Sequence, residues 1–169
     1  VKVTVASYSS SGQKISGEIA KYISPLLQGQ KDYLGGKLPV ENYHFIIYHH
    51  ASGDSLSYFF DGLEHSGSTV ILLNMLLDRK MISNSVYGIA SHEFFHTVLP
   101  LSLHSEEIEY YDFQNPVMSK HLWLYEGMTE YFTMHMPVRQ GLQTVSSFAE
   151  ALEGKIKIMK IFDNSVSFT

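Results

Sequence analysis

The chain of 169 residues contains no cysteine. This absence excludes disulfide bonds, thiolate metal ligands and a cysteine nucleophile together. Any bound metal would therefore have to be held by His, Asp or Glu side chains. A lack of cysteine suits a cytoplasmic protein and a bacterial periplasmic protein equally well, so it does not settle the compartment.

Basic clusters and long hydrophobic runs are absent as well. The chain has 12 Lys and Arg against 17 Asp and Glu, a formal net charge of −5, and its basic residues are spread along the sequence. Nucleic acids and anionic membranes are therefore poor candidates for partners. No apolar run approaches the ~20 residues that cross a bilayer, because the longest, residues 70–77, is interrupted by Asn74. We predict no transmembrane segment and no nucleic-acid partner.

The residues that are present are typical of a globular domain. Hydrophobic residues make up 44% of the chain and charged residues 17%, which is enough apolar surface for one hydrophobic core. The sequence begins with the alternating pattern Val1-Lys2-Val3-Thr4-Val5, without an initiator methionine. We expect residues 1–169 to form one domain that is a piece of a longer polypeptide.

The pattern of elements changes near residue 80. Before it, alternation and β-branched residues predict strands at residues 1–7, 43–48 and 69–73, with an amphipathic helix at 13–27 and a Gly- and Ser-rich loop at 53–67. After it, apolar residues at helical spacing predict helices at 84–99, 119–136 and 144–161, with a polar loop at 102–116. A sheet-rich part, residues 1–80, followed by a helical part, residues 81–169, indicates an α+β fold.

The predicted helix 84–99 carries the motif His92-Glu93-Phe94-Phe95-His96. Residues four apart share one face of a helix, so His92 and His96 can bind one metal ion. Glu93 lies ~100° further around the helix, beside the metal position, where its carboxylate can take a proton from water. In a chain this rich in His and Glu, chance gives such a motif about a few per cent of the time. Its place within an amphipathic helix favours the functional interpretation.

Two histidines leave a catalytic zinc site one protein ligand short, since such sites use three protein ligands and a water. Glu126 and Glu130 lie four residues apart in the predicted helix 119–136 and therefore share a face. If Glu126 is the third ligand, Glu130 lies one turn further on, where it can accept the distal N–H of a ligand histidine. The alternative is a solvated pair on a surface helix. The bulky apolar residues around the pair favour a buried helix, in which carboxylates need a partner.

The stretch from His92 to Phe132 resembles the M61 glycyl aminopeptidase family, which are gluzincin zinc metallopeptidases with a thermolysin-like catalytic domain. The matching motifs, in order, are Gly62-Leu63-Glu64-His65 with Ser68-Thr69-Val70, His92-Glu93-Phe94-Phe95-His96-Thr97, Tyr111-Asp112-Phe113, Leu122-Trp123, and Glu126-Gly127-Met128-Thr129-Glu130-Tyr131. The resemblance covers residues 43–132 and, more loosely, the whole chain.

This resemblance implies a zinc-dependent aminopeptidase that releases N-terminal residues from peptide substrates through metal-activated water, with Zn²⁺ as its cofactor. In gluzincins the glutamate of the Glu-Gly pair is the third zinc ligand, which corresponds to Glu126. In related aminopeptidases a glutamate on the loop before the edge strand binds the substrate's free α-amino group. Glu64 occupies that place, before the strand predicted at 69–73. We assign His65 to the same cleft because it is adjacent to Glu64, and we group Gly62 with them as a substrate-binding residue. An ordinary loop carboxylate is the alternative for Glu64.

Two further interpretations stay open. One is an endopeptidase in which Glu64 binds no amine. The other is a non-catalytic homologue that binds peptides. The presence of Glu93 argues against the second, because a structural zinc site has no use for a base. The resemblance also implies an N-terminal β domain and a C-terminal PDZ-like domain, which we expect elsewhere in the full-length protein.

Overall fold

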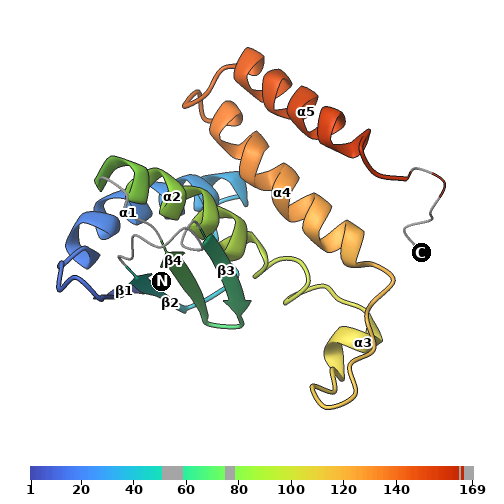
Figure 1. The fold of residues 1–169 in the computed structure, drawn as a ribbon, viewed down its shortest axis with the longest axis horizontal. Helices are drawn as coiled ribbons and strands as arrows, with labels where there is room; N and C mark the ends of the chain where they lie inside the picture. The colour runs from blue at the N-terminus through green and yellow to red at the C-terminus, as the bar shows by residue number, and fades with distance from the viewer. Residues whose placement is uncertain (51–58, 75–78, 164, 166–169) are drawn as a thin grey trace.

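The computed structural model describes residues 1–50, 59–74, 79–163 and 165. Within them a four-stranded mixed sheet precedes a helical half, which confirms the predicted α+β fold (Figure 1). The strand order is β1-β2-β4-β3, formed by Lys2–Ser9 (β1), Asn42–His50 (β2), Ser68–Asn74 (β4) and Phe59–His65 (β3). Strands β1, β2 and β4 are parallel, and β3 runs antiparallel to β4.

One face of the sheet is covered by helices. Tyr43, Phe45 and Ile47 of β2 are buried and the residues between them are exposed, as the two-residue period of a strand requires. The buried face packs against α1 (Ser16–Tyr33) and α2 (Arg79–Phe95), which lie on the same side of the sheet (Figure 1). The core of the molecule therefore lies between this face and the two helices.

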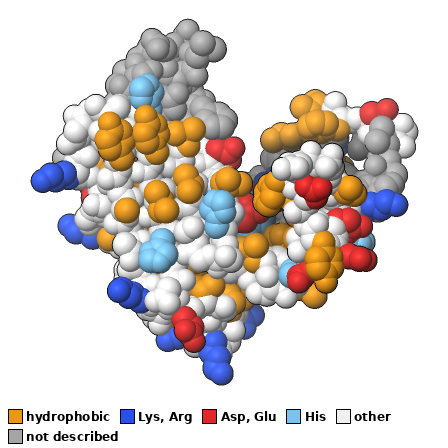
Figure 2. Space-filling model, turned by 90° about the horizontal axis from the view of Figure 1, so that it is seen from below, with side chains coloured by type: hydrophobic (Ala, Val, Ile, Leu, Met, Phe, Trp, Pro, Cys, Tyr) orange, Lys and Arg blue, Asp and Glu red, His pale blue; other side chains and the backbone are white. Residues whose placement is uncertain are grey.

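The opposite face of the sheet is open. Figure 2, which views the molecule from this side, shows hydrophobic and histidine side chains gathered on it. Its exposed hydrophobic residues include Tyr8, Ile46, Tyr48, Leu63 and Val70, and the rings of Tyr8 and Tyr48 stack with centroids 5.5 Å apart. Figure 2 also shows a hollow between the sheet half and the helical half, with acidic side chains along it.

Helix α1 begins and ends later than the predicted 13–27. Pro25 lies inside it, although proline removes a backbone donor and usually ends a helix. The helix continues because the buried stripe continues, with Leu26, Leu27 and Gln30 following Ile23. Gln30 also donates a hydrogen bond from Nε2 to the carbonyl of Ser91 at 3.0 Å. Tertiary packing therefore outweighs the local effect of the proline.

Helix α2 was predicted at 84–99 but ends at Phe95, before the second motif histidine. The amides of Thr97 and Val98 bond three residues back, to the carbonyls of Phe94 and Phe95, and the Thr97 hydroxyl also donates to Phe94 at 2.6 Å. These contacts tighten the chain into turns. His96 is therefore the first residue of a turn, and Pro100 lies beyond the end of the helix.

The helical half follows the prediction closely. Helix α4 spans Leu122–Arg139 and α5 spans Val145–Met159, where helices were predicted at 119–136 and 144–161. Thr144 caps α5 by accepting the amide of Ser147 at 3.1 Å. A short helix, α3 (Glu106–Glu109), lies within the predicted polar loop. Helix α4 packs against α2 and α1, and α5 lies alongside α4 (Figure 1).

The prediction for residues 53–73, a loop followed by an edge strand, was wrong in two respects. Residues 59–65, assigned to a loop at 53–67, form strand β3, while residues 53–58 of that loop lie outside the described residues. Strand β4, assigned to the edge, lies between β2 and β3. Gly62 pairs with Ile71 and Glu64 with Thr69, so hydrogen bonds from β4 stabilise a segment whose own strand propensity is low. Strand β3 is the edge of the sheet on this side.

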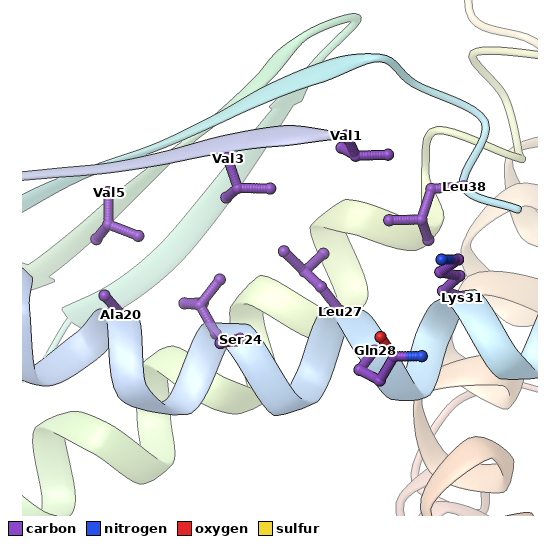
Figure 3. Close-up of a pocket in the computed structure, with 10 residues that line it drawn as sticks. Val1, Val3, Val5, Ala20, Ser24, Leu27, Gln28, Lys31 and Leu38 are labelled. Atoms are coloured by element: carbon purple, nitrogen blue, oxygen red, sulfur yellow. The ribbon is translucent and has the colours of Figure 1, made fainter.

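A groove of about 440 Å³ lies between β1 and α1. Figure 3 shows Val3 and Val5 pointing from β1 towards helix α1, whose Ala20, Ser24 and Leu27 line the other side of the groove. The residues that line this groove include no His, Asp or Glu. It is therefore separate from the motif residues described next. Within the described part of the chain, no helix has the length and apolar character of a membrane span.

Candidate metal centre

Packing of α2 against α4 brings the motif histidines to a glutamate. The Nε2 atom of His92 lies 3.2 Å from Oε2 of Glu126, and Nε2 of His96 lies 3.7 Å from the same oxygen. Ligand atoms ~2.0–2.2 Å from a tetrahedral zinc ion stand roughly 3.3–3.6 Å from one another. The two distances are close to this range, and all three ligand atoms lie within 4.8 Å of one another, so these side chains form a candidate metal site.

The far nitrogen of each imidazole is already bonded. Nδ1 of His92 donates to Oε2 of Glu130 at 3.0 Å, and Nδ1 of His96 donates to the carbonyl of Leu99 at 2.8 Å. Carboxylates and carbonyls only accept, so Nε2 is the atom that each ring leaves for a metal. Metal-binding histidines commonly have such an acceptor behind them. Glu130 lies where its spacing from Glu126 predicted.

The acidic residues around His92 control its charge. Burial alone would lower its pKa, but hydrogen bonds with Glu126 and Glu130 outweigh burial and raise the pKa of His92 to about 9. The hydrogen bond from His92, together with Lys155, lowers the pKa of Glu130 to about 2 against the effect of burial. Mainly through His92, the pKa of Glu126 is also below its usual value. Both carboxylates are therefore ionised at neutral pH, and a metal that binds here displaces a proton from His92.

Glu93 lies beside these ligand atoms and is buried, with 7% of its surface exposed. Burial raises the pKa of Glu93 to about 7; His92 opposes this rise, whereas the negative charges of Glu64 and Glu126 add to it. Among the described residues, its Oε2 atom has no hydrogen-bond partner. A buried carboxylate oxygen needs a partner, so this atom is available to a water or a substrate group. The residues present therefore fit a zinc ion with a neighbouring base.

Strand β3 lies against the other side of Glu93. A Cβ atom added to Gly62 would stand 2.6 Å from both Cγ and Oε1 of Glu93, and 2.6 Å from Cγ2 of Ile89. Only a residue without a side chain allows the strand to approach this closely. The backbone of Gly62 therefore limits where the carboxyl of Glu93 can lie.

Glu64 and His65 lie on opposite faces of β3. A carboxylate oxygen of Glu64 lies within 4.8 Å of ligand atoms of Glu93 and His96. His65 is exposed and points to the open face of the sheet, because successive residues of a strand alternate. The structure thus brings Glu64 and Gly62 to the candidate metal centre and places His65 away from it. His65 was assigned to the cleft because it is adjacent to Glu64 in the sequence. Adjacent residues of a strand point to opposite faces of the sheet, so this reasoning does not hold here.

Two residues at this centre were missed by the sequence analysis. Thr129 is fully buried, donates from Oγ1 to the carbonyl of Leu99 at 3.3 Å, and lies 3.4 Å from Nδ1 of His96. Its position three residues after Glu126 was a usable signal, because such residues share a helix face. Lys155 of α5 places Nζ 2.6 Å from Oε1 of Glu130. No spacing rule connects residues on two different helices.

Comparisons with known proteins agree with this fold and with the family resemblance. Residues 85–165 match the family model described as M61 glycyl aminopeptidase, which confirms the resemblance inferred from the motifs. A solved structure, an aminopeptidase N family protein from Idiomarina loihiensis, is similar with a TM-score of 0.59 and 22% identity. The similarity covers 78% of this chain and 22% of that chain. This chain thus spans about a fifth of that protein, and at this identity the likeness concerns the fold alone. No curated protein matches this chain.

Proposed function

We propose that this chain is the catalytic part of a zinc-dependent peptidase in which His92, His96 and Glu126 hold the zinc ion. One observation carries the proposal: Nε2 of both histidines converges on one oxygen of Glu126, while both Nδ1 atoms are bonded elsewhere. A structural zinc site usually fills its fourth position with protein. Here the neighbouring acid is Glu93, whose Oε2 atom has no hydrogen-bond partner within the described part of the chain, which favours a catalytic site.

When bound, zinc supplies a Lewis acid that activates water and polarises the peptide carbonyl. Glu93 takes a proton from the attacking water, for which its buried Oε2 atom, without a partner among the residues that the structure describes, is available. The same carboxyl then gives the proton to the departing amine as the C–N bond breaks. Hydroxyl is thereby added to the carbonyl carbon and hydrogen to the nitrogen, and Glu93 returns to its starting state.

The free edge of β3 is the proposed place for the peptide. Strand β3 is the last strand of the sheet on this side, and in the described residues it pairs with β4 alone. An extended peptide can add to such an edge through backbone hydrogen bonds. A peptide bound there would pass close to Glu93, because Gly62 in the middle of β3 contacts that side chain.

Glu64 is the proposed partner of the substrate's N-terminal ammonium. It is half-buried on the same face of β3 as Gly62 and lies close to Glu93. Desolvating an ammonium group without a counter-charge is costly, and Glu64 offers a carboxylate beside the proposed peptide edge. This arrangement favours removal of N-terminal residues over cleavage within a chain.

Zinc content and peptide hydrolysis by the full-length protein test the proposal. We expect the wild type to bind zinc and to cleave peptides with a free N-terminus. Glu93→Gln should keep the zinc and lose the activity, because it retains the shape of the side chain and removes the base. Zinc binding without hydrolysis would indicate a peptide-binding homologue instead. A wild-type protein that binds no zinc through His92 and His96 would overturn the proposal.

A further inference from the structure

We propose that Lys155 is a positioning residue for the metal centre: by holding the carboxylate of Glu130, it fixes the ring of His92 and strengthens zinc binding. This inference rests on the proposed function. It assigns a role in the centre to helix α5, which supplies none of the candidate ligands.

Glu130 connects Lys155 with His92 through its two carboxylate oxygens. Oε2 lies 3.0 Å from Nδ1 of His92, and Oε1 lies 2.6 Å from Nζ of Lys155. A carboxylate held at both oxygens cannot rotate about its terminal bond without losing one of these contacts. The direction of Oε2 in turn orients the imidazole ring, because it accepts the Nδ1–H of His92.

Packing between α5 and α4 holds Lys155 in this place. Phe148 lies seven residues before Lys155, or about two helical turns, so both face the same side of α5. The Phe148 ring contacts the rings of Tyr131 and His135 on α4, with centroid distances of 6.3 and 6.0 Å. Tyr131 directly follows Glu130 in the sequence. The aromatic contact therefore holds α5 against α4 near Glu130, and the Lys155 side chain extends to the Glu130 carboxylate.

The ion pair is too exposed to contribute much to folding. The Lys155 side chain is 49% exposed and that of Glu130 33%, and exposed pairs have little effect on the free energy of unfolding. The effect of losing Lys155 should therefore appear at the metal. Loss of a partner that directly orients a ligand weakens metal binding ~10–100-fold. Lys155 acts one contact further away than Glu130, so we expect a loss of roughly 3- to 10-fold.

Helix α5 offers a matched control. Lys157 pairs with Oε1 of Glu153 at 2.7 Å, within the same helix. These side chains are more exposed, at 69% for Lys157 and 63% for Glu153. Replacing Lys155 or Lys157 by Met makes the same change of charge and keeps most of the side-chain length. Of these two lysines, Lys155 is the one bonded to Glu130.

Two measurements on the full-length protein test this role. One is the zinc affinity, from competition with a chelator, and the other is the absorption spectrum of the Co²⁺ form. Lys155→Met should weaken zinc binding and shift the Co²⁺ bands, and Lys155→Arg should restore both. Lys157→Met should change neither. In a Glu130→Gln background, Lys155→Met should have a much smaller effect than in the wild type, because the two residues act through one contact. Melting temperatures of the metal-free variants report any loss of fold, and Lys155→Gln serves as a second variant in that case.

Unchanged zinc affinity and spectrum in Lys155→Met would overturn the inference and leave the proposed function standing. Equal losses of zinc affinity in Lys155→Met and Lys157→Met would also overturn it. Such a result would come from the long-range effect of removing a positive charge and not from the contact with Glu130. If Lys155→Met weakens zinc binding as much in the Glu130→Gln background as in the wild type, Lys155 does not act through Glu130. A wild-type protein that binds no zinc would overturn both the inference and the proposed function.

Discussion

Gly62 of β3 and Glu93 of α2 approach each other so closely that the space between them is too small for a methyl group. We predict that Gly62→Ala moves this carboxyl and lowers kcat, by up to ~100-fold if the shift approaches 1 Å. Zinc content should not change, because the three atoms nearest to the added Cβ belong to Glu93 and Ile89, which are not among the proposed ligands. Gly67→Ala is the matched control, since nothing lies within 4 Å of its added Cβ. Equal activity of Gly62→Ala and wild type would contradict a positioning effect.

Removal of the metal should lower the melting temperature. The candidate ligands come from α2, the turn after it, and α4, so a bound zinc ion would link these segments. A ligand that binds only the folded state stabilises it by about 2.7 kcal/mol at a free concentration of 100 times Kd. We expect a chelator to lower Tm and added zinc to restore it. The same Tm with and without chelator would argue against a zinc site that spans both helices.

Glu126→Ala should lose most of the bound zinc, because it removes one of the three candidate ligands. Metal analysis of the purified full-length protein measures this loss directly. Glu93→Gln is the companion variant and should retain its zinc, since it changes an acid that lies beside the ligand set. Full zinc occupancy in Glu126→Ala would exclude Glu126 as a ligand.

Glu130→Gln should weaken zinc binding by ~10–100-fold without abolishing it. The amide of the introduced Gln can still accept the Nδ1–H of His92. It carries no charge, however, so its interaction with the ammonium of Lys155 is weaker. Chelator competition gives the affinity. Wild-type affinity in this variant would show that the observed hydrogen bond does not affect the metal.

Glu64→Ala should raise KM and lower kcat for peptides with a free N-terminus and leave the zinc content unchanged. The reason is the loss of the carboxylate that we propose to pair with the substrate ammonium. N-acetylated peptides should be poor substrates of the wild type and no worse for the variant. If the wild type cleaves free and acetylated peptides equally well, Glu64 binds no amine and the protein is an endopeptidase.

Local spacing predicted which pairs of side chains lie together at the candidate centre. His92 and His96 are four residues apart, as are Glu126 and Glu130, and each pair shares a face in the structure. Such spacing is a property of a single element and needs no knowledge of its neighbours. The end of α2 was not predictable in this way. It depends on the Thr97 hydroxyl and on amides that bond three residues back.

The sequence by itself determined the α+β order of elements, the motif residues and the absence of any thiolate ligand. Only the tertiary structure decided that β3 is the edge of the sheet, that Glu64 faces the centre while His65 faces away, and that Lys155 reaches Glu130. The physical reason is the range of the interactions. Helical and strand periods act over a few residues, whereas strand pairing and contacts between helices join residues far apart, and their geometry is set by the packing of the whole core.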